Sequence, residues 1–375
     1  MKFVVSSSEL LTPLQAISRV ISSKNSMSIL DNFLFKLSEN TLTITASDLE
    51  TTVQASIPIE TVEKEGVVAI PAKLLTDSLK EFPEQQLGFS LNPENMMIDI
   101  SWAKGKVNLP GLPGDDYPEL PALKEDFTEL LIPAATLAEG ISRSLYATAE
   151  EELRPVMNGI LFDIEAEQTT LVASDAHKLL CYSRKDLVAS NVARFILPKK
   201  PASVLKSLLP KLTGDILVTF DDKNASFLLP NYRLICRLVE GNYPAYRSVI
   251  PTNNINKAVI DRIELLNSVR RVAVCSNQAS NLIRLKLEQD EITVSAQNLD
   301  FSISAYEQIA CQYSGEVMEI GFKWVFLAEI LTNLPGQNVS LELSDPSRAG
   351  LLIPLELNDS NESICALIMP MMIGS

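Results

Sequence analysis

The sequence is poor in the residues that most often carry out chemistry. It contains one histidine, His177, and its five cysteines are scattered and never in CxxC spacing. A zinc site or a disulfide framework needs such residues in clusters. Neither a GxSxG elbow nor a GxxxxGK[ST] phosphate loop is present. We therefore expect no metal, no cofactor and no catalytic activity, although His177 beside Asp175 leaves an acid–base role open at this point.

Long apolar runs and a surplus of positive charge are also missing. No stretch approaches the roughly 18 apolar residues of a membrane span. The opening MKFVVSSSEL turns polar after five residues, which predicts a first strand and not a signal peptide. We expect a cytoplasmic protein with no membrane partner. The formal net charge of −15 by itself disfavours a phosphate-rich partner, so the position of the few positive charges matters.

The chain contains a threefold internal repeat. The strand patterns LTITASDL, TLVASDAH and ITVSAQNL align Asp48, Asp175 and Asn298, which lie roughly 125 residues apart. Each copy predicts an α+β unit of two helices and roughly eight strands. Proline-rich joints at residues 109–126 and 240–254 place the boundaries at 1–125, 126–252 and 253–375. Open sheet edges favour edge-to-edge pairing of such units, and two rows of three units can close into a ring.

The positive charge is concentrated on the predicted helices. Helices over residues 8–24, 72–82, 135–150, 199–212, 261–275 and 322–334 carry a net charge of +5, which leaves −20 for the remaining chain. An ordinary solvated helix surface accounts for this as well as a binding surface does. The pattern lacks stacking aromatics and a base-reading helix, so the binding alternative is weak, sequence-independent contact with duplex phosphates. The candidate residues are Arg19, Lys24, Lys73, Lys80, Arg143, Lys199, Lys200, Lys206, Lys211, Arg262, Arg270 and Arg271.

Several short motifs occur in a specific order. They are MKFVV at the start, LTPLQ at 11–15, ILDNF at 29–33, NGILFD at 158–163, SDAHKL at 174–179, YPAYRSVIP at 243–251 and MPM at 369–371. Together with the repeats they make the chain resemble the bacterial DNA polymerase III β subunits, the sliding clamps, over essentially its whole length. The resemblance implies a homodimeric six-domain ring that encloses double-stranded DNA and tethers polymerase, without chemistry of its own.

The resemblance also implies partners and a site for them. The partners would be the DNA polymerase III α subunit, the clamp loader, repair polymerases, mismatch repair proteins and ligase, each docking a short peptide. His177 would then line a peptide cleft and not a catalytic centre. Flexible apolar side chains suit such a cleft because they repack around different sequences. The matching residues are Met157, Ser174, Ala176, His177, Lys178, Leu179, Pro244, Ser248, Val249, Phe326, Ala349, Ile368, Met369, Pro370 and Met371.

Four positions depart from the family pattern. Ala176 replaces Gly, Lys178 replaces Arg, and Ser248 and Met372 stand where basic residues are common. A lysine lacks the planar fork of arginine, on which a stacked or bidentate contact at 178 would depend. For ring closure the resemblance implies Lys106, Val107 and Leu109 facing Val274, Cys275 and the strand at 297–302 of the other subunit. Hydrophobic periodicity does not distinguish such an interface role from ordinary core packing for Val107, Leu109 and Val274. A repeat protein that binds no nucleic acid is the remaining alternative.

Overall fold

The computed structural model describes residues 1–22, 24–151, 153–188 and 192–373. The chain forms two compact units. The first unit comprises Met1–Ala138 and Lys200–Leu238, and the second comprises Glu139–Lys199 and Val239–Ser375. The middle repeat is therefore divided between the two units. No helix among the described residues is both long and apolar enough to cross a bilayer.

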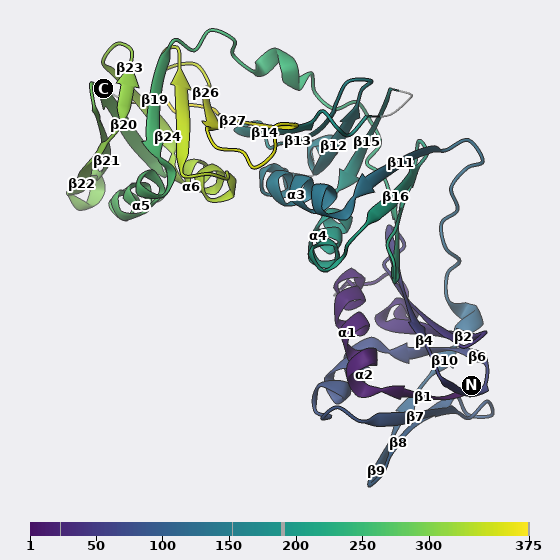
Figure 1. The fold of residues 1–375 in the computed structure, drawn as a ribbon. Helices are drawn as coiled ribbons and strands as arrows, with labels where there is room; N and C mark the ends of the chain where they lie inside the picture. The colour runs from purple at the N-terminus through teal and green to yellow at the C-terminus, as the bar shows by residue number, and fades with distance from the viewer. Residues whose placement is uncertain (23, 152, 189–191, 374–375) are drawn as a thin grey trace. The chain divides into compact units, whose positions relative to one another are not determined.

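The first unit contains two antiparallel sheets (Figure 1). One has the order β5-β1-β7-β8-β9, formed by Thr61–Lys64, Lys2–Ser6, Gln86–Leu91, Met97–Trp102 and Gly105–Pro110. The other has the order β10-β6-β2-β3-β4-β18-β17-β16-β11. Its strands are Leu112–Pro113, Gly66–Pro71, Asn32–Ser38, Thr41–Ser47, Thr51–Pro58, Tyr232–Arg237, Asn224–Leu228, Asp215–Phe220 and Thr128–Pro133.

The second unit repeats this plan with other strands. Its larger sheet has the order β15-β12-β13-β14-β27-β26-β25-β19-β23. The strands are Ala193–Pro198, Gly159–Ile164, Thr169–Ser174, Lys178–Arg184, Glu362–Ile368, Gly350–Pro354, Asn338–Leu343, Asn256–Asp261 and Gln312–Ser314. Its smaller sheet has the order β22-β21-β20-β24, formed by Ile303–Ala310, Glu291–Asn298, Leu282–Glu288 and Met318–Lys323.

All six predicted helices are present. They are α1 (Ser7–Ile17), α2 (Ala72–Lys80), α3 (Ala134–Ser144), α4 (Lys199–Leu208), α5 (Arg262–Ala273) and α6 (Trp324–Asn333). α1 packs on α2, and α5 packs on α6. Several end earlier than predicted, because α1, α3 and α4 continue as 3₁₀ turns over Ser18–Val20, Leu145–Ala147 and Leu209–Lys211. A 3₁₀ turn still buries apolar side chains, so the hydrophobic pattern runs past the α-helical end.

Neighbouring repeats are joined by strand pairing, as the open-edge argument predicts. At the first seam β4 pairs antiparallel with β18, and at the second seam β14 pairs antiparallel with β27. The five-stranded sheet ends on β9 and the four-stranded sheet ends on β22. The predicted α+β class with three tandem repeats is confirmed.

Burial distinguishes β12 and β13 from β20 and β21. β20 and β21 alternate between buried and exposed residues, as half-buried strands do. β12 and β13 are buried along their whole length. The turn that follows β13 is consequently held on a rigid, doubly covered strand, which suits a binding site that must keep its shape.

Candidate functional site

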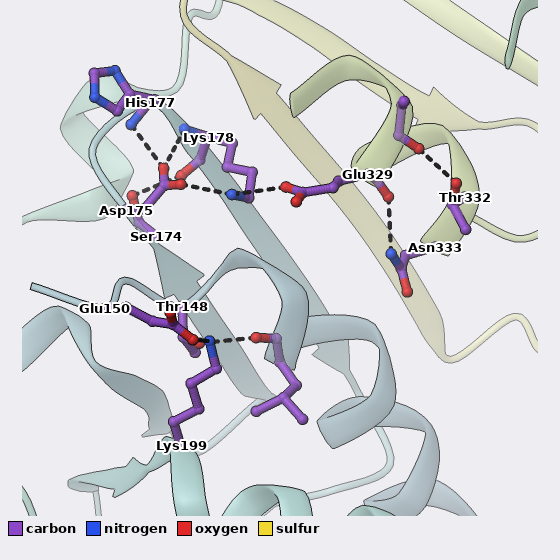
Figure 2. Close-up of polar contacts among 12 residues, drawn as sticks. Thr148, Glu150, Ser174, Asp175, His177, Lys178, Lys199, Glu329, Thr332 and Asn333 are labelled. Carbon is purple, nitrogen blue, oxygen red and sulfur yellow. Dashed lines mark hydrogen bonds and ion pairs between the residues drawn. The ribbon is translucent and has the colours of Figure 1, made fainter. Parts of the chain in front are cut away.

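The turn between β13 and β14 is built by two side chains. Asp175 Oδ1 accepts hydrogen bonds from the backbone N–H groups of His177 (2.9 Å) and Lys178 (2.8 Å). The Ser174 hydroxyl donates to the Lys178 carbonyl (2.9 Å) and accepts from the Ala176 N–H (3.2 Å). Ala176 is left-handed, with φ 73°. Short polar side chains that bond their own backbone in this way are typical of tight turns, and Figure 2 shows the arrangement.

Lys178 connects the turn to α6 through two ion pairs. Its side chain is only 5% exposed, and its ammonium lies 2.6 Å from Asp175 Oδ2 and 3.0 Å from Glu329 Oε2 on α6 (Figure 2). The same ammonium lies 4.6 Å from the centre of the Phe326 ring. A buried charge is stable only when it is paired in this way. Lys178 therefore ties the turn to α6, and its charge is already compensated.

His177 lies on the surface beside α6. Its ring stacks on Phe326, with the ring centres 5.4 Å apart and the planes 17° apart. Its carbonyl accepts a hydrogen bond from the Met369 N–H (2.8 Å). Among the described residues no carboxylate bonds the imidazole, because Asp175 faces the backbone and Lys178. A general base needs such an orienting partner, so the geometry favours binding over catalysis.

The chain after β27 continues along the same surface. The Met371 N–H donates to the Gly321 carbonyl (2.8 Å), forming an isolated bridge with β24. A Cβ atom at Gly321 would lie 2.8 Å from the Met371 carbonyl oxygen, so the close approach requires glycine there. Ile368 is buried, whereas Met369 is exposed. Residues 369–371 are thus fixed beside His177 and β24.

The joint at residues 240–254 is held by one buried carboxylate, that of Asp163 on β12. The Asp163 side chain is 0% exposed. Its oxygens accept from the Tyr246 hydroxyl (2.7 Å), Arg194 Nε (2.6 Å) and Arg247 Nη2 (3.2 Å). Arg247 also forms a two-bond ion pair with Glu165, at 2.8 Å for each contact. Burial raises the pKa of the Tyr246 hydroxyl, so Tyr246 remains a proton donor.

Neither Asp163 nor Tyr246 was predicted from the sequence as a site residue. A usable signal exists in GILFDI, where one acidic residue interrupts an otherwise apolar strand. Carboxylates are rarely buried without partners, so this pattern indicates a basic or hydroxyl partner elsewhere in the chain. It does not say which residue that partner is, because Tyr246 lies more than eighty residues away.

The residues expected in the peptide cleft divide into a buried set and a surface set. Leu179, Ala349 and Tyr246 belong to one buried apolar cluster against which Tyr243 and Ile250 pack. The buried set is Met157, Ser174, Lys178, Leu179, Ala349 and Ile368. The exposed set is Ala176, His177, Pro244, Ser248, Val249 and Met369, with Phe326, Pro370 and Met371 half-buried. Only the second set can meet another molecule directly.

Most of the basic helix residues already have partners within their own unit. Lys73 and Lys80 share Asp77, Lys199 pairs with Glu150 (2.5 Å) and Lys200 pairs with Asp48. The side chains of Arg143 and Arg262 donate to backbone carbonyls at the end of α6 and just beyond it, and Arg271 pairs with Glu307. Among the twelve helix candidates, all of which are described residues, the exposed cations without a carboxylate partner are Arg19, Lys24, Lys206, Lys211 and Arg270.

The residues expected at the subunit interface lie on the end strand β9 and in the segment directly after α5. Lys106 and Val107 lie on β9, where Lys106 pairs with Asp99 (2.7 Å). Leu109 on the same strand is buried within its own unit. Val274 is 80% exposed, directly after α5, and Cys275 is half-buried. The predicted strand at 297–302 is the end of β21 followed by a 3₁₀ turn over Leu299–Phe301, and the end strand β22 begins at Ile303. Phe301 in this turn and Ile303 are both exposed.

Comparison with known proteins places the chain in a family. Models of the N-terminal, central and C-terminal domains of the DNA polymerase III beta subunit match residues 1–121, 131–245 and 247–372. The beta sliding clamp of Proteus mirabilis is 28% identical over 374 residues, covering 99% of this chain and 100% of that protein. The chain belongs to the DNA polymerase III beta subunit family.

Solved structures show the same fold over the full length. A sliding clamp from Pseudomonas aeruginosa bound to griselimycin superposes with a TM-score of 0.93 at 24% identity. One from Bartonella birtlesii, also bound to griselimycin, has a TM-score of 0.92 at 27% identity. Both comparisons cover 100% of each chain. The protein therefore acts as a DNA sliding clamp for DNA polymerase III, a processivity factor and not a catalyst.

Proposed function

We propose that two copies of this chain close head to tail into a ring of six repeats around double-stranded DNA. The observation that carries this proposal is that β9 and β22 are end strands, each of which pairs on one side only among the described residues. Exposed apolar side chains accompany β22, among them Phe301 (74% exposed) and the nearby Val274. Such edges promote association unless another strand pairs with them. Lys106 and Val107 on β9 would face Val274 and Cys275 of the other copy.

The repeat boundaries and the location of the protein belong to the same proposal. We place the repeats at 1–125, 126–252 and 253–375, which agrees with seams formed by β4–β18 and β14–β27. The five free cysteines support a reducing compartment, the cytoplasm.

The cations without carboxylate partners are the residues we propose for DNA contact. A paired lysine must give up its ion pair before it can neutralise a phosphate, whereas an unpaired one need not. Arg19, Lys24, Lys206, Lys211 and Arg270 should therefore carry most of the contact. Five or so weak, salt-sensitive contacts hold the DNA loosely and permit sliding, while ring closure supplies the retention. DNA and polymerase are partners of a sliding clamp in general.

We further propose that the surface around His177 and Val249 receives short peptides from partner proteins. The exposed apolar residues Val249 and Pro244 adjoin Ile250 and Tyr243, which pack on the buried cluster, and the exposed Met369 follows the buried Ile368. Flexible methionine side chains above a rigid buried cluster can accommodate peptides of several related sequences. The partners are the polymerase α subunit, the clamp loader, repair polymerases, mismatch repair proteins and ligase.

Retention on circular against linear DNA tests the ring. After loading by the clamp loader, we expect the protein to stay on a nicked circle and to leave when the circle is cut. Val274→Asp should shift the protein toward monomer in sedimentation and abolish retention. Leu131→Asp makes the same change at an exposed residue of β11 and is the control. Equal retention on circular and linear DNA contradicts the ring.

Binding of a fluorescent peptide of the QLxLF type tests the peptide site. We expect a micromolar Kd, about −8 kcal/mol, that is lost when residues 369–375 are removed. Val249→Asp is a second variant that leaves the chain end in place, and it should weaken binding at least tenfold. Binding that survives both changes places the peptide elsewhere on the protein.

A further inference from the structure

One lysine at the proposed peptide site has no countercharge. Lys323 is the last residue of β24 and directly precedes α6. Its ammonium lies 4.8 Å from the centre of the Phe326 ring. Within the described ranges no carboxylate lies within ion-pair distance of it. The ring face attracts a cation but does not neutralise its charge, so this ammonium remains available to a ligand.

Lys323 belongs to a continuous surface that we call the rim, made of His177, Lys323, Phe326 and Met369. Phe326 stacks on His177 and lies under Lys323, and the His177 carbonyl bonds the Met369 N–H. Phe326 and Lys323 are half-buried, while His177 and Met369 are exposed. A segment lying across Met369 and Phe326 would therefore pass beside the ammonium and exclude part of its water.

The other charges near the rim are already compensated. The Lys178 ammonium lies between Asp175 and Glu329, so its charge is shared by two carboxylates. Arg247, on the joint, is held by Glu165 and Asp163. A ligand group that carries one negative charge can pair with Lys323 alone. A doubly charged phosphate would need a second free cation and would also face Asp175 and Glu329, so the arrangement favours a carboxylate.

From this arrangement we propose that Lys323 is a specificity-determining residue that recognises an acidic side chain in the partner peptide, beside the apolar residues that bind the neighbouring surface. The inference rests on the proposed peptide site and adds the charge of its ligand. A half-buried ion pair of this kind contributes modestly, so an acidic peptide should bind about threefold more tightly than its neutral counterpart. Salt should reduce the preference, because it screens the pair.

The test uses matched peptides and the full-length protein. A fluorescent, acetylated and amidated QLxLF-type peptide is made in Glu and Gln versions at each non-apolar position and at the two flanking positions. Kd is measured at low and at high salt. Blocking both termini ensures that only the side-chain carboxylate differs. A third set, with phosphoserine at the same positions, separates carboxylate from phosphate recognition.

Three variants assign the preference to one residue. Lys323→Gln should abolish the Glu-over-Gln preference, and Lys323→Arg should keep it. Lys257→Gln removes a charge from an exposed lysine that pairs with Glu342 on β25, and it should leave the preference unchanged. Equal binding of Glu and Gln peptides at every position, a preference that survives in Lys323→Gln, or stronger binding of phosphoserine overturns the inference. If no peptide binds the wild-type protein, the peptide site itself is wrong and the inference falls with it.

Discussion

The chain builds the same turn at both seams. At the first seam Asp48 Oδ1 accepts from the N–H groups of Glu50 (3.1 Å) and Thr51 (2.7 Å). At the second seam Asp175 does the same for the two corresponding residues of its own turn. Leu49 is left-handed with φ 76°, close to the 73° of Ala176. The backbone of the turn is therefore a property of the repeat and not of the binding site.

The two turns differ in what surrounds them. Asp48 pairs with Lys200 at the start of α4, whereas Asp175 pairs with Lys178 from its own turn, which reaches on to Glu329. The residue after the left-handed position is Glu50 at the first seam and His177 at the second. Among the described residues, the second turn has an aromatic ring, Phe326, stacked on its His177, and no such ring stacking is seen at the first turn. Side chains that lie far away in the sequence thus turn a common scaffold element into a candidate site.

The largest expected effect is a difference between the two seams in how strongly one arginine substitution destabilises the protein. At the far end of β14, Arg184 is 8% exposed and contacts Asp186 (2.5 Å) and Asp359 (2.6 Å). Arg184→Ala should lower the free energy of unfolding of the second unit by about 2–3 kcal/mol, since it removes the charge-assisted hydrogen bonds that the buried guanidinium makes to Asp186 and Asp359. Arg233 on β18 is exposed and has only a 3.3 Å contact with Ser226. Arg233→Ala should cost the first unit under about 0.5 kcal/mol.

Tryptophan fluorescence can follow the two units separately. The chain has two tryptophans, Trp102 in the first unit and Trp324 in the second. Urea unfolding of Arg184→Ala in a Trp102→Phe background reports the second unit, and Arg233→Ala in a Trp324→Phe background reports the first. Equal destabilisation by the two substitutions would show that the Arg184 cluster does not hold the second seam.

A smaller effect is expected on peptide binding from Asp163. Asp163→Asn keeps the side-chain volume but removes the charge that Tyr246 and Arg247 contact, so the joint should loosen. We expect peptide affinity to fall about five- to tenfold, near 1 kcal/mol. Arg194→Gln is the matched control, because Arg194 bonds Asp163 from β15 and not from the joint. Peptide titrations of both variants below their unfolding temperature check this. Equal losses would make Asp163 a general stability residue.

The acid response should also differ between the seams. The Arg184 guanidinium lowers the pKa of Asp186, and the Asn361 N–H together with Arg184 lowers the pKa of Asp359. A carboxyl whose folded-state pKa is lowered stabilises the fold above its unfolded value, about 3.9, and that stability is lost as the pH falls further. Burial raises the pKa of Glu362, which acts in the opposite direction. The lowered pKa values of Asp186 and Asp359 therefore predict that the contacts around Arg184 lose stability below about pH 4.

The same variant tests the cause of this acid response. In Arg184→Ala the pKa values of Asp186 and Asp359 move back toward normal, so the loss of stability on acidification should be shallower than in wild type. Unfolding free energies between about pH 5 and pH 3, followed through Trp324, check the sign. An unchanged slope would assign the acid response to other groups.

The sequence predicted the elements well and their partners poorly. Alternation and helical spacing are local, so the three repeats and all six helices could be predicted. Helix ends were less certain because residues 18–20 and 209–211 keep the apolar pattern in 3₁₀ turns. The ion pairs could not be predicted from the sequence. Lys199 and Lys200 are adjacent in sequence, yet one pairs with Glu150 and the other with Asp48. Those contacts depend on the fold, and they change which cations are free to meet DNA.

The smallest expected effect concerns the two residues with left-handed backbone conformation, Leu49 and Ala176. A non-glycine residue in this conformation costs about 1 kcal/mol, and glycine removes that cost but adds conformational freedom to the unfolded chain. Ala176→Gly and Leu49→Gly should each change the free energy of unfolding by no more than about 1 kcal/mol, toward stabilisation. Ala176 contributes one methyl group at the surface, so peptide affinity should stay within about twofold. If Ala176→Gly alone alters affinity strongly, then the methyl group contacts the peptide, and the departure at position 176 sets partner choice as Lys323 does.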